Sequence, residues 1–571
     1  MNNINELYNL WCEKATDKAI SDELIAIKGD DEAILDRFYR NLEFGTAGLR
    51  GVIGAGTNRM NIYTVARATQ GFAEYINSVA ENPTVAIAYD SRINSDVFSE
   101  TAACVFAANG IKVYLYPVLV PTPMLSFAVR ELGCDAGVVV TASHNPSKYN
   151  GYKAYGSDGC QLGTEASKAV LDLVEKVDTF GGVNKLDFDE ALNSGKIEYI
   201  KDEVFEKYYE NVMAQSVNPE ILKNAGLKII YTPLNGAGNV PVRTVLDRMG
   251  VKDITIVKEQ EMPDGNFPTA PYPNPEIREA FKLALELADE VKPDLLLATD
   301  PDSDRVGIAV KNGDEYTLMS GNEVGSVMLY YLLSQRTEKG TMPQNPIAVK
   351  TIVTSRLCDK IAADYGCEMV DILTGFKYIG EQIGLLEAKN EQGRYIMGFE
   401  ESYGYLVGTY VRDKDAVVGS MMICEMAAYF KTLGKTLIDV LNELYEKYGM
   451  FLHKQLSFAF EGAEGMKIMA NTMTSLRQNP PTVIADTEVV KVCDYGVSVA
   501  TDLVSGEKTV IELPKSDVLA YSLKGGAEVI IRPSGTEPKI KIYLTAIGES
   551  KCAANELMAK LESAAKPLLG I

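Results

Sequence analysis

Short apolar runs alternate with longer segments of helical periodicity along most of this chain. Early in the chain the apolar runs 84–89, 112–116 and 137–141 predict buried strands, and helices are expected over 96–109 and 123–132. Strands that alternate with helices are typical of parallel sheets covered by helices. The first part of the chain is therefore predicted to form an α/β domain.

The same alternation begins again twice. A second unit is predicted from strands and a helix over 227–231, 240–249, 254–257 and 294–298, and a third from segments over 346–350, 355–365 and 395–397. Between the strands of the second unit, residues 261–276 are rich in Pro, Gly and Asn and are expected to form a loop.

Both ends of the chain depart from this alternation. Residues 1–40 are predicted to be helical, whereas the last 120 or so residues begin as helix and continue with alternating strands such as 527–532 and 539–543. A chain of 571 residues is too long to be expected to form a single hydrophobic core. The prediction is an α/β chain of four domains, three with parallel or mixed sheets and a last α+β domain, with the boundaries 1–205, 206–320, 321–450 and 451–571.

Composition narrows the class of protein. The chain is 46% apolar and 23% charged, as in ordinary globular proteins, and carries a formal net charge of −22. This charge argues against a protein that coats nucleic acid or an anionic membrane. It does not exclude a small anionic substrate, because local Lys and Arg residues can make a positive site in an acidic protein.

The cysteines and the N-terminal residues predict a cytoplasmic protein. The nine cysteines are odd in number and form no C-x-x-C motif, which favours reduced thiols. The N-terminal residues show no basic segment followed by an apolar one, so no signal peptide is expected. No run of about 18 apolar residues predicts a membrane span.

The most informative segment is Thr141-Ala-Ser-His-Asn-Pro146, directly after a predicted buried strand. A serine at a strand end is well placed to carry a phosphoryl group, but its hydroxyl is a weak nucleophile unless a base activates it. His144 and Lys153 are the nearby basic candidates. Adjacent residues of an extended segment point to opposite sides, so His144 is not assumed to be the direct base. A hydroxyl-capped turn and a solvated lysine remain open alternatives, and Asn150-Gly151 could turn Lys153 back toward Ser143.

Asp300, Asp302 and Asp304 alternate within the loop Asp300-Pro-Asp-Ser-Asp-Arg305, and their carboxylates are expected to converge. Hard oxygen ligands of this kind suit Mg²⁺ or Ca²⁺. An EF-hand is excluded because Arg305 and Lys311 stand where its loop needs Gly and Glu, and because both flanks resemble strands. A cation held here could neutralise a phosphate on Ser143. A solvated acidic turn is the alternative.

Three further segments offer polar groups. Glu400 and Ser402, after the strand predicted over 395–397, are expected on one side of an extended segment, where they could bind vicinal sugar hydroxyls; a helix start is the alternative. Arg532-Pro-Ser-Gly-Thr-Glu-Pro538 predicts a phosphate cradle made by Arg532, Ser534, Gly535 and Thr536, or else a capped hairpin turn. Arg50, in the glycine-rich loop predicted over 44–51, could add positive charge to the same site.

These segments, in this order, resemble the α-D-phosphohexomutase superfamily over nearly the whole chain. The resemblance identifies a phosphoserine loop, a metal loop, a sugar loop and a phosphate loop at Thr141–Pro146, Asp300–Arg305, Glu400–Ser402 and Arg532–Pro538. Two further segments, 45–51 and 150–155, resemble the phosphoglucomutase-2 and phosphopentomutase-like branch. Tyr403 departs from the pattern, since many relatives have glycine there.

The resemblance implies four domains around a central cleft and a phosphoryl group carried by Ser143. One Mg²⁺ per chain would be held by Asp300, Asp302, Asp304 and the seryl phosphate oxygen. The resemblance also implies further roles: proton transfer by Arg50 and Lys153, contact of Arg305 with the seryl phosphate, and contact with the sugar by Thr374, Gly375, Lys377 and Lys414.

The implied activity is the interconversion of glucose 1-phosphate and glucose 6-phosphate through glucose 1,6-bisphosphate, which would also serve as activator. Mannose and pentose phosphates remain alternative substrates. A phosphoserine-based phosphomonoesterase is disfavoured, because two histidines cannot supply dense two-metal ligation. A non-catalytic sugar-phosphate sensor would be expected to lose Ser143 or the three aspartates. The expected partner is a sugar monophosphate, without nucleic acid or membrane, and the expected state is a monomer or weak homo-oligomer.

Overall fold

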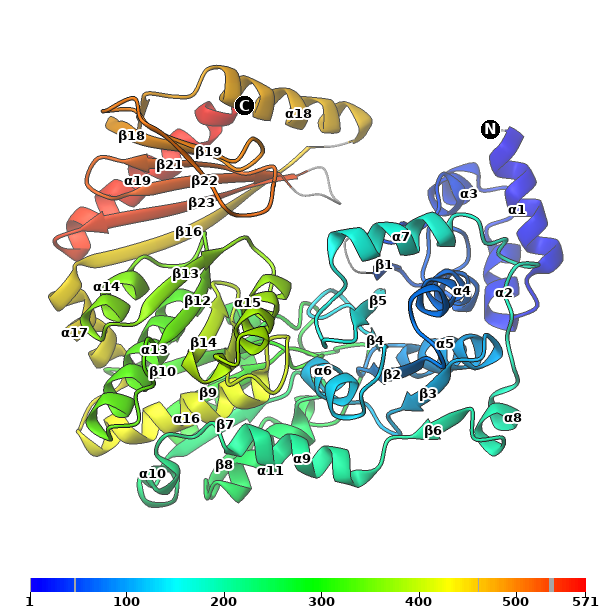
Figure 1. Ribbon diagram of the computed structural model, residues 1–571, viewed down its shortest axis with the longest axis horizontal. Helices are drawn as coiled ribbons and strands as arrows, with labels where there is room; N and C mark the ends of the chain where they lie inside the picture. Colours follow the sequence, from blue (N-terminus) through cyan, green and yellow to red (C-terminus); the bar gives the residue numbers. More distant parts are fainter. Residues whose placement is uncertain (1, 46–47, 461, 534–538) are drawn as a thin grey trace. The chain divides into compact units, whose positions relative to one another are not determined.

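The computed structural model describes residues 2–45, 48–460, 462–533 and 539–571. The chain forms two compact units. The first unit comprises Met1–Gly321 and Ile379–Thr436, and the second comprises Asn322–Tyr378 and Leu437–Ile571. Figure 1 traces the elements of both units.

The N-terminal segment of the first unit is helical, as predicted. It contains α1 (Asn2–Lys14), α2 (Lys18–Ala26) and α3 (Asp31–Phe38). Aspartate side chains cap α2 and α3 by accepting a hydrogen bond from a backbone N–H in the first turn. The buried indole of Trp11 packs edge-on against Phe38, Tyr63 and Phe180. This aromatic cluster fixes the helices on the domain that follows.

The first sheet has six strands in the order β1-β5-β4-β2-β3-β6. The strands are β1 (Gly48–Val52), β2 (Thr84–Tyr89), β3 (Lys112–Leu115), β4 (Ala136–Val140), β5 (Tyr149–Gly156) and β6 (Ile197–Tyr199). The accompanying helices are α4 (Ile62–Val79), α5 (Ser95–Ala108), α6 (Thr122–Glu131), α7 (Thr164–Val174), α8 (Phe188–Asn193) and α9 (Asp202–Met213). Strands β4, β2, β3 and β6 are parallel, which confirms the predicted α/β pattern.

Two loops of the sequence prediction are strands instead. Residues 48–52 and 149–156 form β1 and β5, and β5 runs antiparallel between β1 and β4. The expected turn at Asn150-Gly151 is therefore wrong. A Cβ at Gly151 would lie 2.5 Å from the carbonyl oxygen of Thr141 and 2.9 Å from that of Leu49. Glycine is needed there because three strands approach closely, not because the chain turns.

The second sheet has five strands in the order β11-β10-β9-β7-β8 and is also mixed. Its strands are β7 (Lys228–Thr232), β8 (Asp253–Ile256), β9 (Leu295–Thr299), β10 (Val306–Asn312) and β11 (Glu315–Met319). Its helices are α10 (Pro219–Asn224), α11 (Asn239–Arg248), η1 (Lys258–Gln260), η2 (Arg278–Phe281) and α12 (Lys282–Val291). All five residues of β9 are buried, so this strand delivers the loop that follows it from the middle of the core.

Two strand pairs follow along the chain. In the second unit, β12 (Ile347–Thr351) and β13 (Glu368–Ile372) are parallel, with α13 (Gly321–Glu338) and α14 (Leu357–Asp364) nearby in sequence. In the first unit, β14 (Tyr395–Glu400) and β15 (Gly404–Val407) form an antiparallel hairpin. The remaining helices of this stretch are α15 (Lys377–Ala388), η3 (Gln392–Arg394), α16 (Ala416–Thr432) and α17 (Leu437–Tyr448).

The C-terminal sheet of the second unit is antiparallel throughout, which confirms the predicted α+β ending (Figure 1). Its strands are β16 (Met450–Ala459), β17 (Val483–Ile484), β18 (Thr487–Asp494), β19 (Val499–Asp502), β20 (Lys508–Val510), β21 (Leu519–Leu523), β22 (Glu528–Pro533) and β23 (Lys539–Gly548). Helices α18 (Gly462–Gln478) and α19 (Lys551–Leu569) contribute apolar side chains to the same core as the strands.

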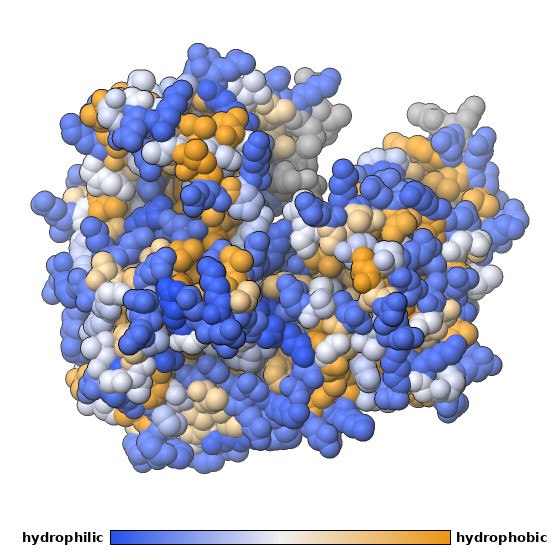
Figure 2. All heavy atoms as spheres, viewed as in Figure 1, coloured by the Kyte–Doolittle hydropathy of each residue, from blue (hydrophilic) through white to orange (hydrophobic). Residues whose placement is uncertain are grey.

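The visible surface is mainly hydrophilic (Figure 2), as expected from the ordinary globular composition and the net charge of −22. Figure 2 shows hydrophilic side chains over most of the visible face, with apolar side chains exposed in scattered places. Among the described residues no single helix is long and apolar enough to cross a membrane, and α16 and α17 meet that test only together, as a bent pair judged by length and composition.

His453, on β16, is a half-buried histidine of the second unit. Its Nδ1 lies 3.1 Å from Thr545 Oγ1 and its Nε2 lies 2.8 Å from Ser355 Oγ. Burial, together with the charge of Lys350, lowers the pKa of His453 from 6.5 to about 4. The imidazole is therefore neutral in the folded chain at neutral pH.

Acidification is expected to destabilise the second unit through His453. Because the unfolded chain takes up the proton near pH 6.5 and the folded chain only near pH 4, stability is lost as the pH falls between these values. From pH 7 to pH 5 the loss is about 2 kcal/mol from this group alone. In His453→Gln the loss should be smaller by that amount, as measured by urea-dependent hydrogen exchange of the β16 and β23 amides. An equal loss in both proteins would contradict a His453 that is neutral in the folded chain.

Candidate active site

The segment after β4 places Ser143 in a tight loop. Its backbone is left-handed, with φ of 52°, and the Thr141 hydroxyl accepts a hydrogen bond from the Ser143 N–H at 2.8 Å. The side chain is buried, and its Oγ donates to Asp300 Oδ2 at 2.9 Å. The loop thus joins two of the predicted motifs, which lie far apart in the sequence.

His144 lies closer to Ser143 than the sequence argument allowed. The Ser143 Oγ is 3.2 Å from His144 Nδ1. The expectation that the two side chains point apart is wrong, because the left-handed Ser143 removes the extended geometry on which it rested. Burial and the charges of Arg305 and Arg50 hold the pKa of His144 well below 6.5, so its imidazole is neutral.

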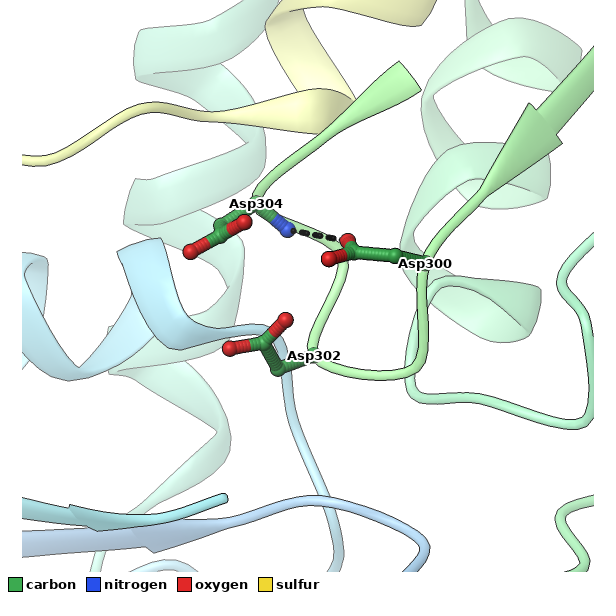
Figure 3. A group of neighbouring side chains, drawn as sticks. All are labelled: Asp300, Asp302 and Asp304. Atoms are coloured by element: carbon green, nitrogen blue, oxygen red, sulfur yellow. Dashed lines mark hydrogen bonds between the residues drawn. The ribbon is translucent and has the colours of Figure 1, made fainter. Parts of the chain in front are cut away.

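The three aspartates of the β9–β10 loop converge as predicted. Each offers a carboxylate oxygen, and these oxygens lie within 4.8 Å of one another (Figure 3). The loop reverses sharply at Ser303, whose φ is 48°, and Asp300 Oδ1 accepts the backbone N–H groups of Asp304 at 3.1 Å and Arg305 at 3.0 Å. These hydrogen bonds close the loop into a compact cluster of acids.

Burial and mutual repulsion act on this cluster. The pKa of Asp300 is raised well above its usual value by burial and by the charges of Asp302 and Asp304. Burial also acts to raise the pKa of Asp302, but the Lys153 ammonium, 2.9 Å from its Oδ2, outweighs it and holds this pKa low. At neutral pH the cluster therefore needs cations close to it.

The cluster fits a metal ion. In the described part of the chain, Asp302 Oδ1 and Asp304 Oδ1 are buried and have no hydrogen-bond partner. Oxygen atoms buried without a hydrogen bond are costly unless a ligand satisfies them. Carboxylate oxygens are the donors that hard divalent cations prefer, so the cluster is a candidate metal site.

Two lysines reach the same carboxylates. Lys153, on β5, contacts Asp302, and its Nζ lies 3.6 Å from Asp304 Oδ2; Lys414 contacts the same oxygen at 3.0 Å. Burial lowers the pKa of each lysine, but the neighbouring carboxylates outweigh it and raise both values. Asp413, which is 3.4 Å from Lys414, accepts a hydrogen bond from Tyr155 at 2.7 Å. Both ammonium groups are therefore charged and held in place.

The predicted sugar-binding pair lies in a turn. Glu400 is the last residue of β14, and Ser402 follows in the turn to β15, where Tyr403 has a φ of 66°. The expectation of one extended segment is wrong, because the chain reverses here into a hairpin. Glu400 is buried. Burial lowers the pKa of Lys414 and of Arg305, but the neighbouring carboxylates outweigh it and raise both values, and Glu400 is one of these carboxylates.

Arg305 and Arg50 add positive charge near the serine loop. Arg305 donates to Glu276 at 2.8 Å and lowers the pKa of His144 through its charge. Arg50 is exposed on β1, opposite Gly151 of β5, and its charge also lowers the pKa of His144.

Four predicted site residues belong to the second unit. Thr374 and Gly375 lie between β13 and α15, where Gly375 has a φ of 124°, and Lys377 begins α15. Arg532 lies on β22, opposite Lys541 of β23. Ser534, Gly535 and Thr536 lie outside the described residues.

Sequence reasoning missed several residues of the site. The Thr122 hydroxyl donates to Asp302 Oδ2 at 3.0 Å, and Glu276 pairs with Arg305. Asp90 and Arg92, which follow β2, contact the Ser143 loop. The carboxyl ends of neighbouring parallel strands lie at one edge of a sheet, and β2 neighbours β4. That topology could have identified Asp90 and Arg92; nothing in the sequence pattern points to Glu276.

Family models match three stretches of the chain. They describe phosphoglucomutase/phosphomannomutase α/β/α domain I over residues 41–180, domain II over 206–313 and domain III over 320–448. The Ser143 loop lies in the first stretch, the three aspartates in the second, and Glu400, Ser402 and Lys414 in the third.

Curated relatives match over nearly the whole length. A phosphoglucomutase of Staphylococcus saprophyticus is 35% identical over 94% of this chain and 96% of its own. Another, of Staphylococcus aureus strain RF122, is 36% identical over 94% of this chain and 95% of its own.

Solved structures share the fold. The open form of parafusin, a phosphoglucomutase from Paramecium, superimposes with a TM-score of 0.69 at 16% identity, covering 93% of this chain and 96% of its own. A phosphoglucomutase/phosphomannomutase family protein from Burkholderia thailandensis gives 0.66 at 18% identity, covering 92% and 97%. With its site geometry, its three matched domains and its relatives taken together, the chain belongs to the phosphoglucomutase/phosphomannomutase family.

Proposed function

We propose that this chain is a phosphoglucomutase that interconverts glucose 1-phosphate and glucose 6-phosphate, with Ser143 as the phosphoryl carrier. The observation that carries the proposal is the 2.9 Å contact between the buried Ser143 Oγ and Asp300 of the three-aspartate cluster. Family membership and relatives named phosphoglucomutase support the same activity.

The proposed reaction consists of two phosphoryl transfers. In the first, a sugar hydroxyl attacks the phosphorus on Ser143; the bond from phosphorus to the serine oxygen breaks, a bond to the sugar oxygen forms, and the hydroxyl loses its proton. Glucose 1,6-bisphosphate results, and the free Ser143 oxygen takes up a proton. In the second transfer, the Ser143 oxygen loses its proton and attacks the phosphorus of the other phosphate. The bond from this phosphorus to the sugar oxygen breaks, and the sugar oxygen takes up a proton, which releases the isomeric monophosphate and restores the phosphoserine. Added glucose 1,6-bisphosphate would phosphorylate Ser143 and so act as activator.

Asp300, Asp302, Asp304 and an oxygen of the seryl phosphate would hold one Mg²⁺. When bound, the ion would offset negative charge on the transferring phosphoryl group. Lys153 and Lys414 lie beside the same carboxylates and keep additional positive charge there.

Arg50, Lys153 and His144 are the proposed groups for proton transfer. The Ser143 hydroxyl has one proton, which it donates to Asp300. The neutral His144, whose Nδ1 lies 3.2 Å from the Ser143 Oγ, is the proposed alternative acceptor of that proton. Lys153 has a raised pKa and therefore stays charged at neutral pH, so its proposed part in proton transfer is to stabilise negative charge on the serine oxygen rather than to remove a proton.

Further residues are proposed to bind the substrate. Glu400 and Ser402 would bind sugar hydroxyls. The other proposed contacts are Arg305 to the seryl phosphate, Lys414, Thr374, Gly375 and Lys377 to the sugar, and Arg532, Ser534, Gly535 and Thr536 to the phosphate that is not reacting. One cradle for that phosphate would serve both orientations of the bisphosphate.

The proposal includes four domains, with the boundaries 1–205, 206–320, 321–450 and 451–571, that carry the serine, metal, sugar and phosphate loops. The proposal also includes a cytoplasmic location, a monomeric or weakly homo-oligomeric state, and no nucleic acid or membrane as partner. The acidic net charge of −22 is consistent with a positive site that is local rather than extended.

A coupled assay with glucose 1-phosphate, mannose 1-phosphate and ribose 1-phosphate tests the proposal. The expected result is the highest kcat/KM with glucose 1-phosphate, in the presence of Mg²⁺ and catalytic glucose 1,6-bisphosphate. A preference for mannose 1-phosphate or ribose 1-phosphate would replace it with a phosphomannomutase or a phosphopentomutase. No turnover of any of the three would refute a mutase function.

Arg532→Ala is expected to weaken substrate binding in both reaction directions. Hydrogen bonds to charged groups contribute about 1.5–3 kcal/mol, which corresponds to a roughly ten- to hundredfold rise in KM. KM is measured with glucose 1-phosphate and with glucose 6-phosphate. Lys524→Ala, which changes an exposed lysine in the turn between β21 and β22, is the control and should leave KM unchanged. Unchanged KM in Arg532→Ala in both directions would show that Arg532 belongs to a hairpin and not to a phosphate cradle.

A further inference from the structure

The guanidinium of Arg92 lies behind the Ser143 loop and is completely buried. Its Nη2 donates to the carbonyl oxygens of Ser143 and Asn145. Its Nη1 donates to those of Pro146 at 3.1 Å and Tyr149 at 3.0 Å. One side chain therefore satisfies four carbonyl groups along the segment that links β4 to β5.

Asp90 connects the same guanidinium to Thr141, at the start of the loop. Its carboxylate pairs with Arg92 at 3.4 Å and accepts the Thr141 hydroxyl at 2.6 Å. The Thr141 Oγ1 in turn accepts the backbone N–H of Ser143 at 2.8 Å. A continuous chain of polar contacts thus runs from Asp90 to the backbone of Ser143. The Ser95 hydroxyl, which donates to Asp90 at 2.8 Å, anchors the carboxylate from α5.

The loop over 261–276 holds Arg92 from its other side. The Arg92 guanidinium lies 5.0 Å from the ring centroid of Phe267, which is fully buried. A Cβ at Gly265 would meet the Ile93 N–H nitrogen at 2.5 Å and the Ser91 carbonyl oxygen at 2.8 Å, so this loop packs directly on the backbone around Arg92. Arg92 is therefore enclosed and has one available arrangement.

We propose that Arg92 and Asp90 are positioning residues that hold Ser143 in its left-handed conformation, with its Oγ toward Asp300. The inference rests on the proposed function. A non-glycine residue adopts a left-handed backbone at a cost, so the surrounding contacts must fix it. Arg92 holds the loop through its carbonyl groups, and Asp90 holds the Ser143 N–H through the hydroxyl of Thr141. Neither side chain needs to touch the substrate for this role.

The geometry explains why the residue is arginine. A planar guanidinium can donate to several carbonyls in fixed directions, whereas a lysine ammonium is a compact charge with three donors. Arg92→Lys keeps the positive charge but loses the planar arrangement of N–H donors. Because a displacement of about 1 Å can lower a rate by roughly a hundredfold, Arg92→Lys is expected to lower kcat by about that factor. KM should change by less than about threefold, since the substrate contacts remain.

Thr141→Val tests the other side of the loop. Valine has nearly the shape of threonine but removes both the hydrogen bond to Asp90 and the one from the Ser143 N–H. A smaller fall in kcat, about tenfold, is expected, since these are two neutral or singly charged hydrogen bonds. This variant also decides the question if Arg92→Lys does not fold.

The experiment measures kcat, KM, the rate at which glucose 1,6-bisphosphate phosphorylates Ser143, and the ³¹P chemical shift of the phosphoserine. Both variants should slow phosphorylation in proportion to kcat and shift or broaden the ³¹P signal, while thermal unfolding shows a folded chain. Arg59→Lys is the matched control: Arg59 is also buried, pairs with Asp36 and donates to two carbonyls, but lies outside the loop.

The outcomes separate the two claims. Wild-type protein without mutase turnover would refute the proposed function. Active wild-type protein, with normal kcat and normal Ser143 phosphorylation in Arg92→Lys or, if that variant is unfolded, in Thr141→Val, would overturn the positioning role. So would a loss that lies in KM alone, or an equal loss in Arg59→Lys.

Discussion

Replacing Ser143 by alanine is expected to lower mutase turnover by several orders of magnitude and to leave the fold intact. The hydroxyl is the only atom of this side chain that could form the phosphoenzyme, so its loss removes the covalent route rather than slowing one step. The loop itself should persist, because the Ser143 N–H still donates to Thr141 and the backbone contacts with Arg92 are unchanged. The loss of the hydrogen bond to Asp300 should cost only about 0.5–1.5 kcal/mol of stability.

The measurement is kcat in the coupled assay, with mass spectrometry of the Ser143 peptide from wild-type protein. Ser99→Ala is a matched control, since Ser99 is a fully buried serine of the same sheet's helix layer whose hydroxyl has no hydrogen-bond partner within the described residues. Ser99→Ala should keep its activity. Near-normal turnover in Ser143→Ala, together with wild-type protein that carries no phosphate on Ser143, would refute the carrier role.

The strands and the metal cluster could be predicted from sequence because both depend on local pattern. β4 and β9 are continuous buried runs. The three aspartates alternate within a five-residue loop, so the local conformation of this loop is nearly enough to bring them together. In the same way, the alternating residues of β22 and β23 sufficed to predict strands in a C-terminal α+β domain.

The contacts between distant segments could not be predicted in this way. The meeting of Ser143 with Asp300 depends on how the first two sheets of the first unit pack, which no local pattern encodes. The position of β5 between β1 and β4 was missed because Asn150-Gly151 has the composition of a turn, and only the packing of three strands explains the glycine. The left-handed backbone of Ser143 depends on Arg92, a residue 51 positions earlier in the sequence.

The site also resolves the apparent conflict between an acidic chain and an anionic substrate. Although the net charge is −22, Lys153, Lys414, Arg305 and Arg92 are all buried or partly buried around the aspartates. These cations are paired with carboxylates, so their positive charge is already balanced before any phosphate enters. A phosphate on Ser143 would disturb that balance unless another cation came with it, which is the physical reason to expect a metal ion here.

Asp302→Asn is expected to weaken Mg²⁺ binding by at least about tenfold and to lower kcat with it, because the charge of the ligands sets the affinity of oxygen sites for divalent cations. Asparagine preserves the shape of the side chain, so the loop should fold. The Asp302 Oδ2 accepts hydrogen bonds from Lys153 and Thr122, and the amide oxygen of an asparagine would keep part of these contacts. Isothermal titration with Mg²⁺ gives the affinity directly, and wild-type activity should vanish with excess chelator and return with Mg²⁺.

Asp314→Asn is the matched control, since it makes the same change of charge at an exposed position of the β10–β11 turn in the same sheet. It should change neither the Mg²⁺ affinity nor kcat. Because Lys153 loses a charged partner in Asp302→Asn, activity alone could fall for a reason other than the metal. The titration separates the two causes: a fall in kcat with unchanged Mg²⁺ affinity would assign Asp302 to holding Lys153, and full wild-type activity in excess chelator would exclude a catalytic metal at the three aspartates.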